Sequence, residues 1–257
     1  DDWLGEATPA AVRRRLNRLW PDLCPVATIG EPPPTPAPDP RPPQLCPGCG
    51  HRSAFTAIAK ALRPQDITVG DIGCHTLGFL PPHRMGQVLL CMGASPSLAA
   101  GLRLFQTERK VLAFIGDSTL FHAGIPGLIN LLFNQHPVTL VIMENQTTAM
   151  TGHQNHPGTG AHFDGPSPRI DLPELLAGMG IHSVRRVDAY QQARLTEAVK
   201  EALAEDGPSV VIAHHPCMLQ VMKKKRRDPA YSPRRVRVDP RKCTLSRDCL
   251  NRFGCPS

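Results

Sequence analysis

Residues 111–152 read VLAFIGDSTLFHAGIPGLINLLFNQHPVTLVIMENQTTAMTG, and the alternation of apolar and polar segments in this stretch decides the fold. Residues 111–115 and 138–143 are short apolar runs typical of buried strands, and the apolar side chains of residues 124–133 recur at helical spacing. The stretch therefore predicts one βαβ unit. Its two polar turns fall at the same edge of a parallel sheet, where α/β proteins bind ligands.

Oxygen-bearing side chains follow both predicted strands. Asp117 comes after the first strand and Asn145 after the second, and the backbone carbonyl of Thr147 follows closely. This oxygen set suits Mg²⁺, which also keeps positions for phosphate oxygens and water. Gly116 allows a diphosphate to approach the backbone, and the start of the next helix offers free N–H groups to it. The residues alone leave a capped turn without a ligand as the alternative.

The rest of the chain extends this sheet. We expect helices over residues 53–62, 97–105, 172–178 and 190–205, and strands starting at residue 67 and over residues 88–92, 182–187 and 209–214. The turn at residues 93–95 is either a second ligand-facing helix N-terminus or a plain helix start. The pattern predicts a doubly wound α/β fold.

Several motifs are shared with one enzyme family. Residues 116–118 (GDS), followed across a helix and a strand by residues 144–147 (ENQT), resemble the thiamine diphosphate motif. The further motifs are CPGCGH at 46–51, GDIGCHTLGFLPP at 70–82, CMGAS at 91–95, GDSTLFHAGIPGLIN at 116–130 and TTAMTGHQNHPGTG at 147–160. Together they make residues 45–256 similar to the catalytic, C-terminal half of the large subunit of the indolepyruvate:ferredoxin oxidoreductases, a branch of the 2-oxoacid:ferredoxin oxidoreductases.

The resemblance implies a fold and a cofactor. The fold is α/β, with a doubly wound, mostly parallel sheet of the thiamine diphosphate-binding type. The resemblance also implies which residues bind thiamine diphosphate: Gly73, Gly116, Asp117, Ser118, Asn145 and Thr147. Of these, Asp117, Asn145 and Thr147 would hold Mg²⁺.

The nine cysteines argue for metal ligation or free buried thiols rather than for disulfides. The C-x-x-C pair suits zinc, an iron–sulfur cluster or a redox dithiol, and its spacing does not choose among them. In the family that the chain resembles, the corresponding positions bind a 4Fe–4S cluster; here they are Cys46, Cys49, Cys74 and Cys217. We expect Cys91, within the predicted strand 88–92, and Cys24 to be ordinary thiols.

The chain divides into a linker, a core domain and a tail. Residues 1–44 contain a short amphipathic helix within residues 8–20 and an extended proline-rich connector over residues 31–43. The core domain covers residues 45–221, and residues 222–257 form a basic linker and the start of a ferredoxin-like segment. That segment carries Cys243, Cys249 and Cys255, with Ser246 where the family has a further cysteine, so we expect no complete second cluster.

The composition excludes several classes of protein. A chain of 257 residues that is 41% hydrophobic can bury a full core, and it has no signal peptide and no apolar run of membrane length. We therefore expect a cytoplasmic protein. Because it starts at Asp1 and ends in a cysteine-containing stretch, we expect a piece of a longer polypeptide.

Much of the net charge of +7 lies in residues 223–227 (KKKRR). Such a run is either a solvated segment or a docking site for an acidic protein or domain. We do not expect nucleic acid as a partner, because aromatic side chains and a nucleic-acid-binding motif are missing from this region of the sequence.

Histidines lie near the predicted site. His75 and His122 are candidates for proton transfer or for binding the substrate carboxylate. His153, His156 and His162 fall in a glycine-rich stretch, residues 148–164. We expect a loop that closes over the cofactor there rather than a zinc site, because no cysteine or acidic partner accompanies the three histidines at ligand spacing.

The resemblance implies an enzyme that decarboxylates a 2-oxoacid oxidatively with thiamine diphosphate. The substrate would be an arylpyruvate such as indolepyruvate, the product an acyl-CoA, and the electrons would pass through iron–sulfur clusters to ferredoxin. It further implies an upstream pyrimidine-binding domain, a smaller partner subunit and an oligomer. Two alternatives remain from the sequence: a non-oxidative thiamine diphosphate-dependent decarboxylase or synthase, and an iron–sulfur or zinc interaction module with a basic nucleic-acid-binding tail.

Overall fold

The computed structural model describes residues 8–23, 43–232 and 237–252. They belong to two compact units, Asp1–Pro42 and Pro43–Ser257. The expectations for Cys24, for the connector up to residue 42 and for Cys255 lie outside the described residues. In the first unit the predicted helix is present as α1, Pro9–Leu19, where Thr8 Oγ1 accepts a hydrogen bond from the N–H of Ala11 at 3.2 Å.

The second unit is built on a parallel sheet. Its strands are β1 Ile67–Val69, β2 Val111–Gly116, β3 Val138–Glu144, β6 Val184–Asp188 and β7 Ser209–His214. In the described residues they pair in the order β1-β2-β3-β7-β6, and every pairing is parallel. The carboxyl ends of all these strands therefore lie at one edge of the sheet. The predicted parallel sheet is confirmed.

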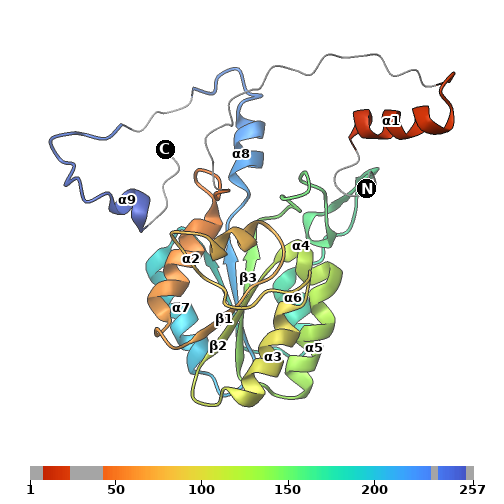
Figure 1. The fold of residues 1–257 in the computed structure, drawn as a ribbon. Coiled ribbons are helices and arrows are strands. Elements are labelled where there is room, and N and C mark those ends of the chain that lie inside the picture. Colours follow the sequence, from red (N-terminus) through yellow and green to blue (C-terminus); the bar gives the residue numbers. More distant parts are fainter. Residues whose placement is uncertain (1–7, 24–42, 233–236, 253–257) are drawn as a thin grey trace. The chain divides into compact units, whose positions relative to one another are not determined.

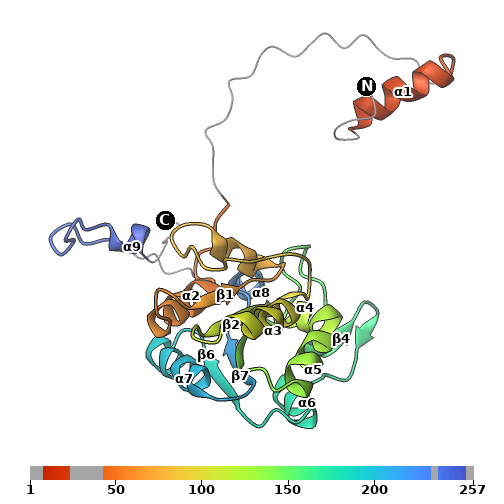
Figure 2. The same cartoon turned by 60° about the horizontal axis from the view of Figure 1, so that its bottom comes forward.

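Helices cover both faces of the sheet. Figure 1 and the turned view in Figure 2 show α2 Gly50–Ala61 and α7 Gln192–Ala204 on one face, with α3 Ser95–Phe105, α5 Ile125–Phe133 and α6 Leu172–Gly178 on the other. Each face has its own buried apolar cluster, because successive side chains of a strand point to opposite sides. Leu112 and Phe114 of β2 belong to the cluster under α2 and α7, whereas Ala113 and Ile115 belong to the other.

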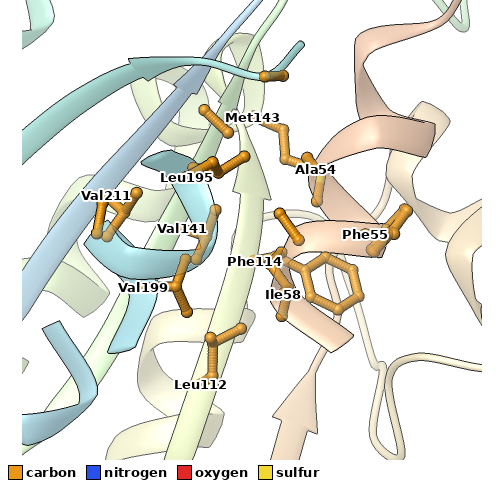
Figure 3. Close-up of a cluster of buried hydrophobic side chains, with 14 of the residues drawn as sticks. Ala54, Phe55, Ile58, Leu112, Phe114, Val141, Met143, Leu195, Val199 and Val211 are labelled. Atoms are coloured by element: carbon orange, nitrogen blue, oxygen red, sulfur yellow. The ribbon is translucent and has the colours of Figure 1, made fainter. Parts of the chain in front are cut away.

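Phe114 joins β2 to α2. Its ring meets that of Phe55 edge to face, with centroids 5.2 Å apart, and both side chains are fully buried. Figure 3 shows Phe114 beside Ile58 and Phe55. This contact holds α2, and the C-x-x-C turn that precedes it, against the sheet.

The remaining elements are short. They are α4 Asp117–Thr119, a wide turn over Leu120–Gly124, the turns Cys74–Phe79 and Pro157–Thr159, β4 Ala161–His162, β5 Gly165–Pro166, α8 Met218–Lys225 and α9 Asp248–Asn251. No helix among the described residues combines the length and the apolar character needed to cross a membrane.

The predicted strand over residues 88–92 is wrong. Val88 makes a single bridge to Val69 of β1, and the chain then leaves the sheet. Leu90 is 67% exposed, and Cys91 is an exposed thiol. The physical reason is that β1 is a short edge strand, so that its outer side offers little backbone for a further strand to pair with. The apolar run resembled a buried strand without having a place in the sheet.

Candidate functional site

The two polar turns that the sequence predicted to meet do meet at the carboxyl edge of the sheet. The carboxylate of Asp117 is buried. Its Oδ1 accepts a hydrogen bond from the N–H of Ser118 at 2.8 Å, and its Oδ2 accepts from the N–H groups of Asn145 and Gln146 at 3.0 and 2.7 Å. The side chain of Asn145 accepts in turn from the N–H of Thr147 at 3.0 Å. Asp117 therefore ties the end of β2 to the turn after β3.

The six residues predicted to bind thiamine diphosphate line one cavity of about 90 Å³: Gly73, Gly116, Asp117, Ser118, Asn145 and Thr147. Two of them leave room by lacking a side chain. A Cβ atom at Gly73 would lie 2.6 Å from Cε1 of His75, and one at Gly116 would lie 3.0 Å from the same atom. Gly73 also has a φ of +153°, which side chains disfavour. Carboxylate and amide oxygens beside open backbone form a donor set that fits Mg²⁺ and a diphosphate.

A buried carboxylate that the sequence analysis did not single out shapes the neighbouring turn. Asp71 follows β1 and is fully buried. Its Oδ1 accepts from the N–H groups of Ile72 and Gly93 at 2.8 and 2.7 Å, and its Oδ2 accepts from the N–H of Ser95 at 2.9 Å. The amides at residues 93 and 95 are therefore bound to Asp71. Of the two interpretations of this turn, a plain helix start anchored by a carboxylate agrees with the structure.

Four cysteines from three separate segments line a second cavity, of about 200 Å³: Cys46, Cys49, Cys74 and Cys217. The C-x-x-C turn is closed by a hydrogen bond from the N–H of Cys49 to the carbonyl of Cys46 at 3.1 Å. The N–H of Cys217 donates to the carbonyl of Asn145 at 3.0 Å, so that Cys217, the third residue after β7, is held next to the turn after β3. Leu45, Leu77 and Met218 contribute apolar wall to the same cavity.

Two thiols of this cavity, those of Cys49 and Cys74, are protonated at neutral pH unless a positively charged group, such as a metal centre, lies beside them. Burial, with smaller contributions from negative charge on Cys49, Cys217 and Cys46, raises the pKa of Cys74 to about 11. Burial likewise raises the pKa of Cys49. Among the residues that the structure describes, no group of three or more His, Cys, Asp or Glu side chains could hold a metal ion. An iron–sulfur cluster is larger than one ion and is bound by four thiolates, so that the four thiols around one cavity fit it by their chemistry.

The family model for the C-terminal TPP-binding domain of thiamine pyrophosphate enzymes matches residues 71–213, which is more than half of the chain. The chain belongs to this family. The match includes every predicted thiamine diphosphate ligand and ends in β7, shortly before Cys217.

Two curated relatives of known name are similar to most of this chain. Over 231 residues the chain is 42% identical to the indolepyruvate oxidoreductase subunit IorA of Pyrococcus horikoshii. The aligned region covers 85% of this chain and 36% of that protein. Over 221 residues the chain is 40% identical to IorA of Archaeoglobus fulgidus, and this aligned region covers 85% of this chain and 35% of that protein. The chain thus spans just over a third of the length of these curated relatives.

A solved structure shares the fold of this thiamine pyrophosphate enzyme domain. It is a 2-oxoglutarate:ferredoxin oxidoreductase from Magnetococcus marinus with 2-oxoglutarate, coenzyme A and succinyl-CoA bound. The TM-score is 0.63 at 17% identity, over 76% of this chain and 74% of that one. The predicted fold class and the predicted resemblance to the 2-oxoacid:ferredoxin oxidoreductases are confirmed.

Two buried imidazoles lie beside the cavity that contains Asp117. His51 and His75 both line it, with ring centroids 6.2 Å apart. Burial lowers the pKa of each to about 4, and the neighbouring His75 contributes to the lowering at His51. Both rings are therefore neutral at neutral pH. In the part of the chain that the structure describes, Nε2 of His75 is buried without a hydrogen-bond partner, whereas His122 is exposed and lines neither cavity.

The three histidines of the glycine-rich loop have different surroundings. His153 lines the cysteine cavity, His162 is exposed, and His156 is buried. His156 Nδ1 accepts from the N–H of Gly158 at 3.2 Å, so in a neutral ring the proton is on Nε2. That Nε2 lies 3.4 Å from Oδ2 of Asp117. These positions do not support a zinc site formed by the three histidines together.

A third buried carboxylate, Glu144, joins the end of β3 to β7 and β6. It accepts hydrogen bonds from Arg186 of β6 at 3.0 and 2.9 Å, and it lies 3.0 Å from Nδ1 of His214 of β7. Burial opposes its ionisation, but His214 and Arg186 outweigh burial and keep the pKa of Glu144 below its usual value. Sequence patterns do not indicate this network, because the partners of Glu144 come from strands far along the chain.

In the tail, Cys243 and Cys249 are exposed and Ser246 lies between them, while Cys255 lies outside the described residues. The expectation that this segment holds no complete cluster stays a prediction.

Proposed function

We propose that this chain is the thiamine diphosphate-binding part of a 2-oxoacid:ferredoxin oxidoreductase. In this proposal the enzyme converts a 2-oxoacid, an arylpyruvate such as indolepyruvate, to an acyl-CoA and passes the electrons to ferredoxin. The names of the relatives that match most of this chain support the substrate. The upstream pyrimidine-binding domain, the smaller partner subunit, the oligomer and the cytoplasmic location belong to the same proposal.

One observation carries the proposal: the cavity with the predicted thiamine diphosphate ligands and the cavity with the four cysteines adjoin. They share His51, Cys74, Asn145, Ala149 and Met150 as lining residues. A redox centre that adjoins the thiamine site suits one-electron transfer from the cofactor. A non-oxidative thiamine enzyme would have no use for it.

When bound, thiamine diphosphate supplies the carbanion that adds to the keto carbon and makes decarboxylation possible, and the cluster supplies one-electron redox chemistry. The protein binds and orients these groups. Asp117, Asn145 and the carbonyl of Thr147 would hold Mg²⁺, and Gly73 and Gly116 leave the backbone open to the diphosphate. The four thiolates would hold the cluster.

The buried imidazoles of His51 and His75 would exchange hydrogen bonds with bound groups while staying uncharged. Because His51 and His75 are neutral at neutral pH, they place no positive charge beside the Mg²⁺ ligands. Nε2 of His75 has no hydrogen-bond partner among the described residues and is free to donate or accept one hydrogen bond at the cavity. The partly buried apolar side chain of Leu77 would keep water from the reacting groups.

Iron and acid-labile sulfide content, measured anaerobically on the full-length protein, tests this proposal. Cys74→Ser should remove about four irons per chain, whereas Cys91→Ser, which changes an exposed thiol outside the cavity, should remove none. Thiamine diphosphate binding is measured on the same samples. Protein that binds thiamine diphosphate and Mg²⁺ but contains no iron would overturn the proposal and favour a non-oxidative enzyme.

A further inference from the structure

A third cavity at the carboxyl edge of the sheet has a chemistry that the proposed reaction centre does not use. Its volume is about 480 Å³, a size typical of ligand sites. Lys223, Lys224 and Arg227 contribute to its lining, together with the amide side chains of Gln146 and Gln220. No acidic side chain is among the described residues that line it.

The cavity divides the basic run in two. Lys223, Lys224 and Arg227 line it, whereas Lys225 and Arg226 do not. Lys223 lies in the last turn of α8 and Arg227 in the turn that follows it, and side chains four positions apart on a helix lie on the same side. Lys225 Nζ instead lies 5.9 Å from the ring centroid of Tyr231. A run that looked uniform in the sequence therefore has a face turned to the cavity and a face turned away from it.

The charge of the cavity fits phosphate. None of its three cationic side chains pairs with an acidic side chain in the part of the chain that the structure describes. Three positive charges exceed what one carboxylate needs and match a phosphate or diphosphate group. An arginine can bind two phosphate oxygens at once, and amide groups supply further donors.

The cavity also lies next to the proposed reaction centre. Asn145 and Thr147 line both this cavity and the one that contains Asp117, and Cys217 lines both this cavity and the cysteine cavity. A bound phosphate group would thus have the rest of its molecule within reach of that centre. Among the proposed substrates, coenzyme A carries phosphates on a nucleotide and its reactive thiol at the end of a long arm.

We propose that this basic cavity binds the phosphate groups of coenzyme A. The proposal rests on the proposed function, which requires an acyl acceptor. The diphosphate of thiamine diphosphate is a second source of the same chemistry, but none of the three cations lines the cavity of Asp117. A docked acidic protein would meet the exposed Lys225 and Arg226 as well, and its binding would not depend on the cavity face.

The test compares two pairs of substitutions in the full-length protein. Lys224→Ala with Arg227→Ala removes two charges from the cavity, and Lys225→Ala with Arg226→Ala removes the same two residue types from the other face. The probe is adenosine 3′,5′-bisphosphate, which has phosphates but no thiol, and its binding is measured by titration calorimetry. We expect the cavity pair to weaken its binding, and to raise KM for coenzyme A, by about tenfold or more. The other pair should change neither quantity by more than about twofold.

Thiamine diphosphate affinity and KM for the 2-oxoacid should stay unchanged in both pairs. Equal losses in both pairs would reduce the effect to general attraction by a basic segment and would overturn the proposal. Loss of thiamine diphosphate affinity in the cavity pair, or a rise in KM for ferredoxin alone, would overturn it in favour of the cofactor or of protein docking. An unmodified protein that contains iron and binds thiamine diphosphate but not the bisphosphate would overturn this proposal and leave the proposed function standing.

Discussion

Replacing His156 tests whether the buried histidine of the glycine-rich loop supports the carboxylate of Asp117. His156→Asn keeps an oxygen where Nδ1 accepts from the N–H of Gly158, but it has nothing where Nε2 faces Asp117. His156→Gln is the complementary change, because its amide nitrogen can reach the position of Nε2. We expect the asparagine variant to bind thiamine diphosphate and Mg²⁺ more weakly and the glutamine variant to retain most of the affinity.

The size of the effect follows from the geometry. A hydrogen bond to a charged group contributes about 1.5–3 kcal/mol at a normal length. The distance from Nε2 of His156 to Oδ2 of Asp117 is 3.4 Å, and Nε2 makes no hydrogen bond of normal geometry with the described residues, so we take the lower limit for this electrostatic contact. Both side chains are almost fully buried, so water screens the interaction little. A loss of about 1.5 kcal/mol corresponds to roughly tenfold in affinity, within the range of about 10- to 100-fold seen for groups that support metal ligands.

The assay is calorimetric titration of thiamine diphosphate into the full-length protein with excess Mg²⁺. His162→Asn is the control, because Nδ1 of His162 also accepts a backbone N–H, that of Asp164 at 3.1 Å, but the side chain is exposed. An asparagine variant at position 156 that binds like the unmodified protein would refute the reasoning. So would equal losses in the asparagine and glutamine variants, or an equal loss in His162→Asn.

Three further predictions concern stability. Asp66 is buried, and although burial opposes its ionisation, hydrogen bonds from Arg63 and from a backbone amide hold its pKa below the usual value. The stabilisation that the Asp66 carboxylate contributes is present above about pH 4 and is lost as the pH falls through its lowered pKa. Asp66→Asn should therefore lower the free energy of unfolding by about 2 kcal/mol at neutral pH. The thermal transition temperature of the variant should also depend less on pH in the acid range. Gly78→Ala should lower the thermal transition by the equivalent of about 1–3 kcal/mol, because the new Cβ would lie 2.2 Å from the buried ring of Phe55. Gly101→Ala, where a Cβ meets nothing within 4 Å inside α3, should raise the transition by about 0.5–1 kcal/mol; an equal loss in both glycine variants would contradict the steric argument.

The sheet could be predicted because its signals are local. Residues 111–115, 138–143 and 209–214 are apolar runs bounded by polar turns, and all three are strands in the structure. Residues 88–92 carry a similar signal and form no strand. An apolar run reports that side chains avoid water, but it does not report whether the sheet has a free edge long enough to pair with.

The candidate ligands were predictable for a related reason. In parallel strands, the residues that follow each strand reach the same edge, so Asp117 and Asn145 could be brought together without knowing any distance. The spacing of Cys46 and Cys49 similarly placed both thiols on one turn. The predicted role of His122 beside the site had no such basis, and its side chain is exposed.

The sequence by itself determined the layered α/β architecture, the edge at which the site lies and the residue types gathered there. Tertiary structure decided which of three loop histidines faces Asp117, that Asp71 takes the amides of the 93–95 turn, and which lysines of the basic run line a cavity. The physical reason is the separation along the chain over which each kind of interaction acts. Strand, helix and turn preferences act between residues a few positions apart, whereas these contacts join residues tens of positions apart, and their partners are set only when the layers pack.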